Sequence, residues 1–194
     1  MSLKLLFGLF SIALALIGYI PYIQDILAHK TKPHAFSWLV WAILSAIAFG
    51  IQLTKHGGPG AWLMGFTACI TFFIFLLASK YGEKNIVLLD WACLSLSLIA
   101  LGLWVLVDKP LESVLLIAFV DAVGGFVPTF RKAFPKPYEE TLILYYLYAV
   151  SLGCSLLALQ SFTLITAFYP ASFVAINLLM ATFLSIRRRQ LRSV

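Results

Sequence analysis

The stretch DAVGGFVPTFRKAFPKPYEET, residues 121–141, places an acid, a Gly-Gly pair and a proline in an apolar run and continues into a basic turn. The stretch GYIPYIQDILAHKTKP, residues 18–33, repeats this layout without the acid. The two align when the chain is shifted on itself by 107 residues, the separation of Pro21 and Pro128. The same ungapped shift pairs Gly18 with Gly125, Trp38 with Tyr145, Trp41 with Tyr148 and Phe66 with Phe173. We therefore predict a duplicated unit, because self-similarity at one offset indicates a repeat architecture.

Composition predicts a membrane protein. Hydrophobic residues make up 62% of the chain, charged residues only 11%, and the mean hydropathy is +0.97. Soluble proteins carry about 25% charged residues, and apolar runs of about 18 residues or more indicate bilayer spans. The net charge of +6 comes from basic residues scattered between the apolar runs or placed at the C-terminus. We therefore expect a lipid bilayer, and no nucleic acid, as a partner.

The apolar runs predict an all-α fold with seven transmembrane helices. We expect these helices at residues 5–27, 35–54, 60–79, 86–107, 112–133, 140–160 and 163–186. The connections are short and rich in proline, glycine and lysine, which are typical of turns. The first run follows Lys4 as in a secretory signal, but no small-residue cleavage site follows it, so we expect it to be a span.

The distribution of lysine and arginine predicts the orientation. With the N-terminus outside, only Lys4, Lys55 and Lys109 fall in outer segments, and the other eleven of the 14 basic residues fall in cytoplasmic ones. Short cytoplasmic loops are enriched in basic residues in membrane proteins. We expect an integral protein of the plasma membrane, or of the bacterial inner membrane, with the C-terminus in the cytoplasm.

The predicted topology explains the odd number of helices. A three-helix unit leaves the membrane on the side opposite to its entry, so a second copy in the same orientation needs one extra helix. We predict a first three-helix bundle at residues 1–80, an inversion linker helix at 81–110 and a second bundle at 111–194. This 3+1+3 plan has parallel repeats about an axis along the membrane normal, an arrangement found in transporters.

The plan resembles the PQ-loop superfamily and its SWEET sugar-transporter branch, because a proline lies near the cytoplasmic end of the first helix of each bundle. The Pro-Gln dipeptide itself is absent, since Tyr22 follows Pro21 and Thr129 follows Pro128. The resemblance implies a secondary transporter or facilitator that moves a small polar solute, such as a sugar, an amino acid or a vitamin-like molecule, by alternating access. The alternative is a ligand-sensing or scaffolding protein of the same fold, as the similar KDEL receptor permits.

The two prolines predict hinges. Proline removes one backbone donor and clashes with the preceding helical turn, which bends a helix. Neighbouring glycines remove side-chain bulk and permit close approach or rocking of helices. The predicted hinge residues are Gly18, Pro21, Gly124, Gly125 and Pro128. The alternative is a static kink with small-residue packing.

Asp121 is the candidate for proton coupling. A carboxylate deep in hydrocarbon costs at least about 2.5–3.5 kcal/mol, so it should face protein or water. Asp121, Gly125 and Pro128 have the i, i+4, i+7 spacing of one helical face. Burial disfavours the charged form of an acid, so protonation of this residue could be linked to solute movement. In the PQ-loop proteins that this chain resembles, proton-coupled exporters use an acid in this helix. The alternative is that Asp121 stays neutral in a structural hydrogen bond.

Polar and aromatic residues near the predicted midplane are candidates for solute binding. Asn177 offers two donors and an acceptor, and SWEET proteins place an asparagine on this helix in the solute pocket. Thr67 and Thr71 are further candidates, although their hydroxyls can bond to their own helix. The alternative for Asn177 is a structural bond between helices.

Aromatic pairs occur at equivalent places on the second and sixth helices. They are Trp38 with Trp41 and Tyr145 with Tyr148. Aromatic walls suit flat solute faces, whereas an interfacial belt of aromatic residues is the competing explanation. We expect Trp38 and Tyr145 in the belt and consider Trp41 and Tyr148 candidate binding residues.

No enzymatic pattern is found in the sequence. Cys69, Cys93 and Cys154 are dispersed through the spans, and there is no phosphate-binding or dinucleotide-binding fingerprint. We expect a protein that is not an enzyme and needs no cofactor or metal. Its expected partners are a small-molecule solute, protons, the bilayer and a second copy of the chain.

Overall fold

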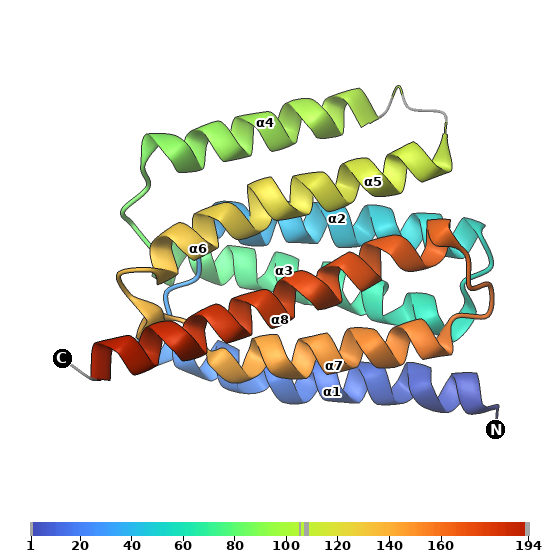
Figure 1. The fold of residues 1–194 in the computed structure, drawn as a ribbon, viewed down its shortest axis with the longest axis horizontal. Coiled ribbons are helices and arrows are strands. Elements are labelled where there is room, and N and C mark those ends of the chain that lie inside the picture. The colour runs from blue at the N-terminus through green and yellow to red at the C-terminus, as the bar shows by residue number, and fades with distance from the viewer. Residues whose placement is uncertain (1, 105, 107–108, 193–194) are drawn as a thin grey trace.

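The computed structural model describes residues 2–104, 106 and 109–192, which form a bundle of helices aligned along one axis (Figure 1). The helices are α1 (Leu3–Leu27), α2 (Ala35–Thr54), α3 (Trp62–Tyr81), α4 (Leu88–Trp104), α5 (Pro110–Val120), α6 (Val127–Ala133), α7 (Leu142–Ala158) and α8 (Leu164–Arg192). Two 3₁₀ turns, η1 (Gly58–Ala61) and η3 (Pro137–Glu139), precede α3 and α7. A π-helical segment, η2 (Asp121–Phe126), joins α5 and α6 into one continuous helix, which we call the α5–α6 helix.

The predicted all-helical class is confirmed. Among the described residues, five helical segments are long and apolar enough to cross a membrane: Leu3–Leu27, Ala35–Thr54, Gly58–Tyr81, Pro110–Ala133 and Leu164–Leu191. Helices α4 and α7 are also apolar but have 17 residues each, which corresponds to about 25 Å. The predicted end of the fourth helix, Val107, lies outside the described residues.

The exposed and buried surfaces have the polarity expected in lipid. Large apolar side chains are exposed on the outside of the bundle, among them Phe10, Ile20, Phe72, Ile99 and Leu157. Polar side chains are buried inside it, among them Ser11, Gln52, Thr67, Asp121 and Asn177. This is the reverse of the usual soluble arrangement, and contiguous exposed apolar surface indicates contact with a membrane or a partner.

The helix packing joins helices both between and within the predicted halves. Helix α1 packs along α7 and against α3, whereas the α5–α6 helix packs against α2 and α8. Within the predicted halves, α2 packs along α3 and α7 packs along α8. Helix α4 lies at the edge of the bundle, where it contacts the α5–α6 helix and α2 (Figure 1).

One end of the bundle, which we call the basic end, contains α6 and the start of α7 and includes buried charges. Lys132 Nζ donates to Glu140 Oε1 at 2.5 Å and to the backbone carbonyl of Lys32 at 2.6 Å, and both side chains of this ion pair are 1% exposed. Tyr145 donates to the other oxygen of Glu140 at 2.9 Å. Lys32 forms an ion pair with Glu139 at 2.9 Å. These bonds join the α1–α2 loop to α6 and to the segment that precedes α7.

A second ion pair, between the partly exposed Arg131 and the buried Asp90, attaches α4 to the basic end. Arg131 Nε and Nη2 donate to the two carboxylate oxygens of Asp90 at 2.8 and 2.7 Å. His34 Nε2, at the start of α2, lies 3.5 Å from Asp90 Oδ2. Burial lowers the pKa of His34 below its ordinary value, and the nearby Asp90 carboxylate opposes this effect without overcoming it. His34 is therefore neutral at neutral pH.

We expect the stability of the protein to fall when the solution is acidified below about pH 6.5, the ordinary histidine pKa. The unfolded chain then binds a proton at His34 that the folded chain does not, so the loss approaches about 1.4 kcal/mol per pH unit until the lowered folded pKa is reached. Thermal unfolding in detergent at a series of pH values measures this slope. His34→Gln should flatten it, and an equal slope in both proteins would contradict the assignment.

Candidate functional site

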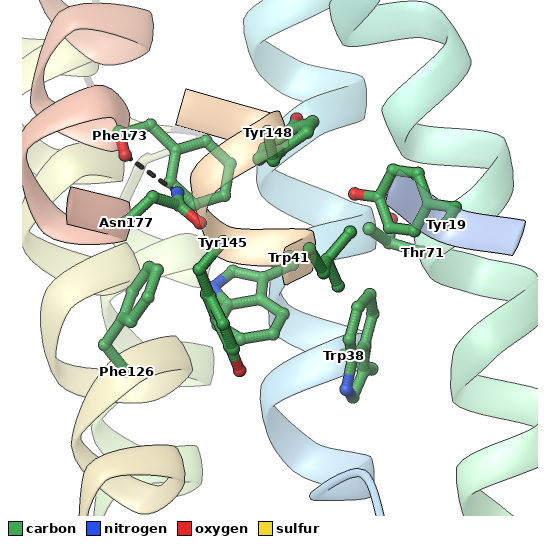
Figure 2. Close-up of a pocket in the computed structure, with 10 residues that line it drawn as sticks. Tyr19, Trp38, Trp41, Thr71, Phe126, Tyr145, Tyr148, Phe173 and Asn177 are labelled. Carbon is green, nitrogen blue, oxygen red and sulfur yellow. Dashed lines mark hydrogen bonds between the residues drawn. The ribbon is translucent and has the colours of Figure 1, made fainter. Parts of the chain in front are cut away.

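A cavity of about 20 Å³ lies between helices of the two predicted halves, and Figure 2 shows the residues that line it. It is lined by Tyr19, Trp38, Trp41, Thr71, Phe126, Leu144, Tyr145, Tyr148, Phe173 and Asn177. Six of the seven predicted helices contribute, and α4 does not. A space of this size holds about one water molecule, so it is too small for a larger solute.

Aromatic side chains form most of the cavity wall, and they are related by the 107-residue offset. The equivalent pairs are Tyr19 with Phe126, Trp38 with Tyr145 and Trp41 with Tyr148. Contacts between the halves are duplicated as well. The rings of Tyr19 and Tyr148 are 5.6 Å apart, and those of the equivalent Phe126 and Trp41 are 5.0 Å apart.

Contacts within each half are also duplicated. The rings of Tyr19 and Phe66 are 6.2 Å apart, and those of their equivalents Phe126 and Phe173 are 5.9 Å apart. Tilted and edge-to-face aromatic pairs at such separations are favourable. The cavity is therefore surrounded by equivalent rings from the two halves, as expected for a site on an axis that relates the repeats.

The polar groups at the cavity include the side-chain oxygen of Asn177, an acceptor that does not bond to the backbone of α8. Asn177 Nδ2 donates to the Phe173 carbonyl at 2.8 Å, which leaves the Asn177 oxygen on the cavity side (Figure 2). Thr71 donates to the carbonyl of Thr67 at 2.6 Å, and the Thr67 hydroxyl in turn bonds to Tyr148 at 2.6 Å. Asn177 is therefore the side chain best placed to accept a hydrogen bond from a solute.

The structure brings together four of the six predicted binding residues, namely Trp41, Thr71, Tyr148 and Asn177. Thr67 lies behind Tyr148 and does not line the cavity. The belt prediction for Trp38 and Tyr145 is wrong, because they are 4% and 3% exposed and face the cavity. Residues spaced by three on a helix share a face, so Trp38 and Tyr145 point inward with their neighbours.

Sequence reasoning missed Tyr19, Phe126 and Phe173 as lining residues. The signal was present in the repeat, since the offset pairs Tyr19 with Phe126 just as it pairs the prolines two residues later. An aromatic residue one position beyond each aligned glycine points to the same inner face. Repeat-equivalent aromatic residues would therefore have identified most of the wall.

Asp121 lies behind the cavity wall, at the start of the π-helical segment. It is 2% exposed and does not line the cavity. The indole N–H of Trp41 interacts with its carboxylate, but the contact falls short of hydrogen-bond geometry. Trp41 Nε1 and Asp121 Oδ1 both have no hydrogen-bond partner among the described residues. Trp41 thus stands between the cavity and the acid.

The predicted hinge glycines permit close contacts with neighbouring helices. A Cβ at Gly125 would lie 2.2 Å from Trp41 Nε1, and one at Gly124 would lie 1.9 Å from Ser97 Oγ on α4. At Gly18 a Cβ would meet Leu147 at 3.3 Å, which is a tight contact. Gly124 and Gly125 therefore make room for side chains from α4 and α2.

The two predicted hinge prolines have different surroundings. Helix α1 continues through Pro21, whereas Pro128 directly follows the π-helical segment that contains Asp121. Single π-helical turns within α-helices are frequent at functional sites. The irregular backbone therefore lies in the second half, beside the acid.

Comparison with known protein families, with curated proteins and with solved structures found no match. Within the described residues, no group of three or more histidine, cysteine, aspartate and glutamate side chains could hold a metal ion. The chemistry of the site thus comes from aromatic rings, one free amide oxygen and one buried acid.

Proposed function

We propose that this chain is a secondary transporter or facilitator that moves a small polar solute by alternating access, with Asp121 coupling transport to protons. The observation that carries this proposal is the closed cavity between the halves, which is surrounded by repeat-equivalent aromatic residues. Transporters with internal repeats place their solute site near the midplane, where the repeats meet. The resemblance to the PQ-loop and SWEET proteins agrees with this function.

The proposed architecture has seven spans in a 3+1+3 arrangement, with α4 as the inversion linker. The duplicated ring contacts and the equivalent packing of α1 and the α5–α6 helix support two related bundles. The excess of basic residues at the basic end supports a cytoplasmic location for that end, with the N-terminus outside. The small size of the cavity corresponds to a state in which no solute is bound in it.

The lining limits the solute class. Flat or partly apolar faces suit the aromatic walls, and a donor group suits the free oxygen of Asn177. Among the described residues, no lysine or arginine lines the cavity, and the acid Asp121 is buried behind its wall. We infer that the solute is neutral, cationic or zwitterionic and carries at least one N–H or O–H group.

Asn177→Leu should weaken solute binding about tenfold, because one hydrogen bond is lost and an acceptor on the cavity side is removed. A thermal-shift screen of sugars, amino acids, nucleosides and vitamins on the purified protein identifies the solute, since a ligand of the folded state raises the melting temperature. Titration of that solute and uptake into proteoliposomes then measure the loss.

Leu179→Ala is the matched control, because Leu179 lies on the same helix and is 59% exposed on the outer surface. It should leave solute affinity unchanged. Equal affinities of the wild type and Asn177→Leu would remove Asn177 from the site. Binding without uptake would support the ligand-sensing alternative in place of transport.

A further inference from the structure

Four buried polar atoms gather around Asp121 without a hydrogen-bond partner in the part of the chain that the structure describes. They are Trp41 Nε1, Ser45 Oγ, Asp121 Oδ1 and Tyr169 OH. Their side chains are at most 4% exposed. Buried polar groups are nearly always hydrogen-bonded, either to protein or to ordered water. A cluster of such atoms in one place indicates a hydrated site.

The cluster is connected through interactions among α2, η2 and α8. Tyr169 interacts with Ser45 on one side and with Asp121 on the other, although the contact with Ser45 falls short of hydrogen-bond geometry. Among the described residues, the titratable groups that interact with Asp121 are Tyr148 from α7 and Tyr169 from α8. These groups include donors (the indole N–H and the two hydroxyls) and an acceptor (the carboxylate). Such a mixture can bind water, whereas a bare cation would need acceptors alone.

One buried face of α2, which we call the polar stripe, runs from Trp41 to Gln52, toward the end of the bundle opposite the basic end. Trp41, Ser45, Ala48 and Gln52 are spaced as one helical face, and all are buried. Gln52 Nε2 donates at 2.8 Å to the carbonyl of Thr166, which Pro170 leaves without its helical donor. Gln52 Oε1 has no partner among the described residues. Gln52 lies two residues before the end of α2, so the stripe reaches that end of the bundle.

The alternative route to Asp121, through the aromatic cavity, is closed in this structure. The cavity holds about one water molecule, and Asp121 does not line it. Trp41 lines the cavity with its ring and points its N–H at the carboxylate. A Cβ on Gly125 would lie 2.2 Å from that nitrogen, so the indole packs directly against the π-helical segment that contains Asp121.

We propose that Asp121 exchanges its proton with the outer solution through water molecules held by Ser45, Tyr169 and Gln52, along a path separate from the solute cavity. The proposal rests on the proton coupling described above. When Asp121 releases its proton, the carboxyl O–H bond breaks and the first water accepts the proton. Each following water or hydroxyl accepts one proton and passes on another. Asp121 ends as a carboxylate, and the outer solution gains one proton.

A pH jump on the wild-type protein in oriented liposomes tests this path. The jump is applied at the end where α2 terminates, and the infrared band of the protonated Asp121 carboxyl is followed in time. The band is identified by its loss in Asp121→Asn. Ser45→Ala and Tyr169→Phe each remove one unpartnered oxygen, and each should slow the relaxation at least about tenfold, as loss of a proton relay does. The midpoint of the titration and the melting temperature should stay close to those of the wild type.

Tyr22→Phe is the matched control. Its hydroxyl is also buried and unpartnered among the described residues, but it lies on α1, outside the stripe. This variant should relax at the wild-type rate. Wild-type rates in both Ser45→Ala and Tyr169→Phe would overturn the path and leave proton coupling intact. A wild-type protein in which the Asp121 band never titrates would overturn both the path and the proposed coupling.

Discussion

Asp121→Asn should abolish the accumulation of solute driven by a proton gradient, a fall of at least about tenfold in the steady-state concentration ratio. Asparagine keeps the shape of the side chain but cannot release a proton, so the site stays in one charge state. Movement of solute down its own gradient should persist, because the aromatic cavity is unchanged. Uptake into proteoliposomes with and without an imposed pH gradient separates the two activities.

Glu112→Gln provides the control for this experiment. Glu112 is an acid on the same α5–α6 helix, but it is exposed and forms a surface ion pair with Lys109. Its removal should leave accumulation unchanged. If Asp121→Asn still concentrated solute in response to the proton gradient, Asp121 would be a structural acid and coupling would require another group.

Lys132→Met should lower the free energy of unfolding by about 3–5 kcal/mol, the usual cost of removing one partner of a buried ion pair. Lys132 and Glu140 are each only 1% exposed, and the lysine also donates to two backbone carbonyls. Its loss leaves the Glu140 carboxylate buried with Tyr145 as its remaining side-chain donor. Chemical unfolding in detergent micelles measures the change.

Two further variants test whether the lower free energy of unfolding of Lys132→Met comes from an unpaired charge. Lys132→Met combined with Glu140→Leu should recover most of the stability, since no charge is then left unpaired. Lys109→Met removes an exposed pair, with side chains 76% and 55% exposed, and should cost less than about 1 kcal/mol. A double variant as unstable as Lys132→Met would show that the ion pair contributes through packing instead of charge.

The helices could be predicted because each depends on a local property of the chain. Apolar runs and turn residues placed most helices close to their observed bounds, for example α2 at Ala35–Thr54, whereas α8 continues to Arg192, six residues beyond the predicted end at residue 186. The repeat was also detectable, since Pro21 and Pro128 can be aligned without knowledge of any contact. Trp41, Thr71, Tyr148 and Asn177 were identified by residue type and depth.

The remaining features depend on how each helix is rotated and on which neighbour it meets. Trp38 was assigned to the interface because depth alone cannot distinguish a lipid-facing from an inward-facing residue. The pairing of Asp90 with Arg131 joins residues 41 positions apart, which no local pattern indicates. The π-helical segment at Asp121 was likewise not indicated by a local pattern, and within it Gly125 accommodates the indole of Trp41.

The ion pair between Lys32 and Glu139 has a consequence for the relationship between the two halves. The residues are 107 positions apart, so they occupy equivalent positions in the repeat and touch each other at 2.9 Å. A dimer built from two copies of either half would place lysine against lysine or glutamate against glutamate there, and like charges repel. In the duplication that we propose, this ion pair makes the two halves complementary to each other at that position. Their fusion in one chain supplies both parts in a fixed one-to-one ratio.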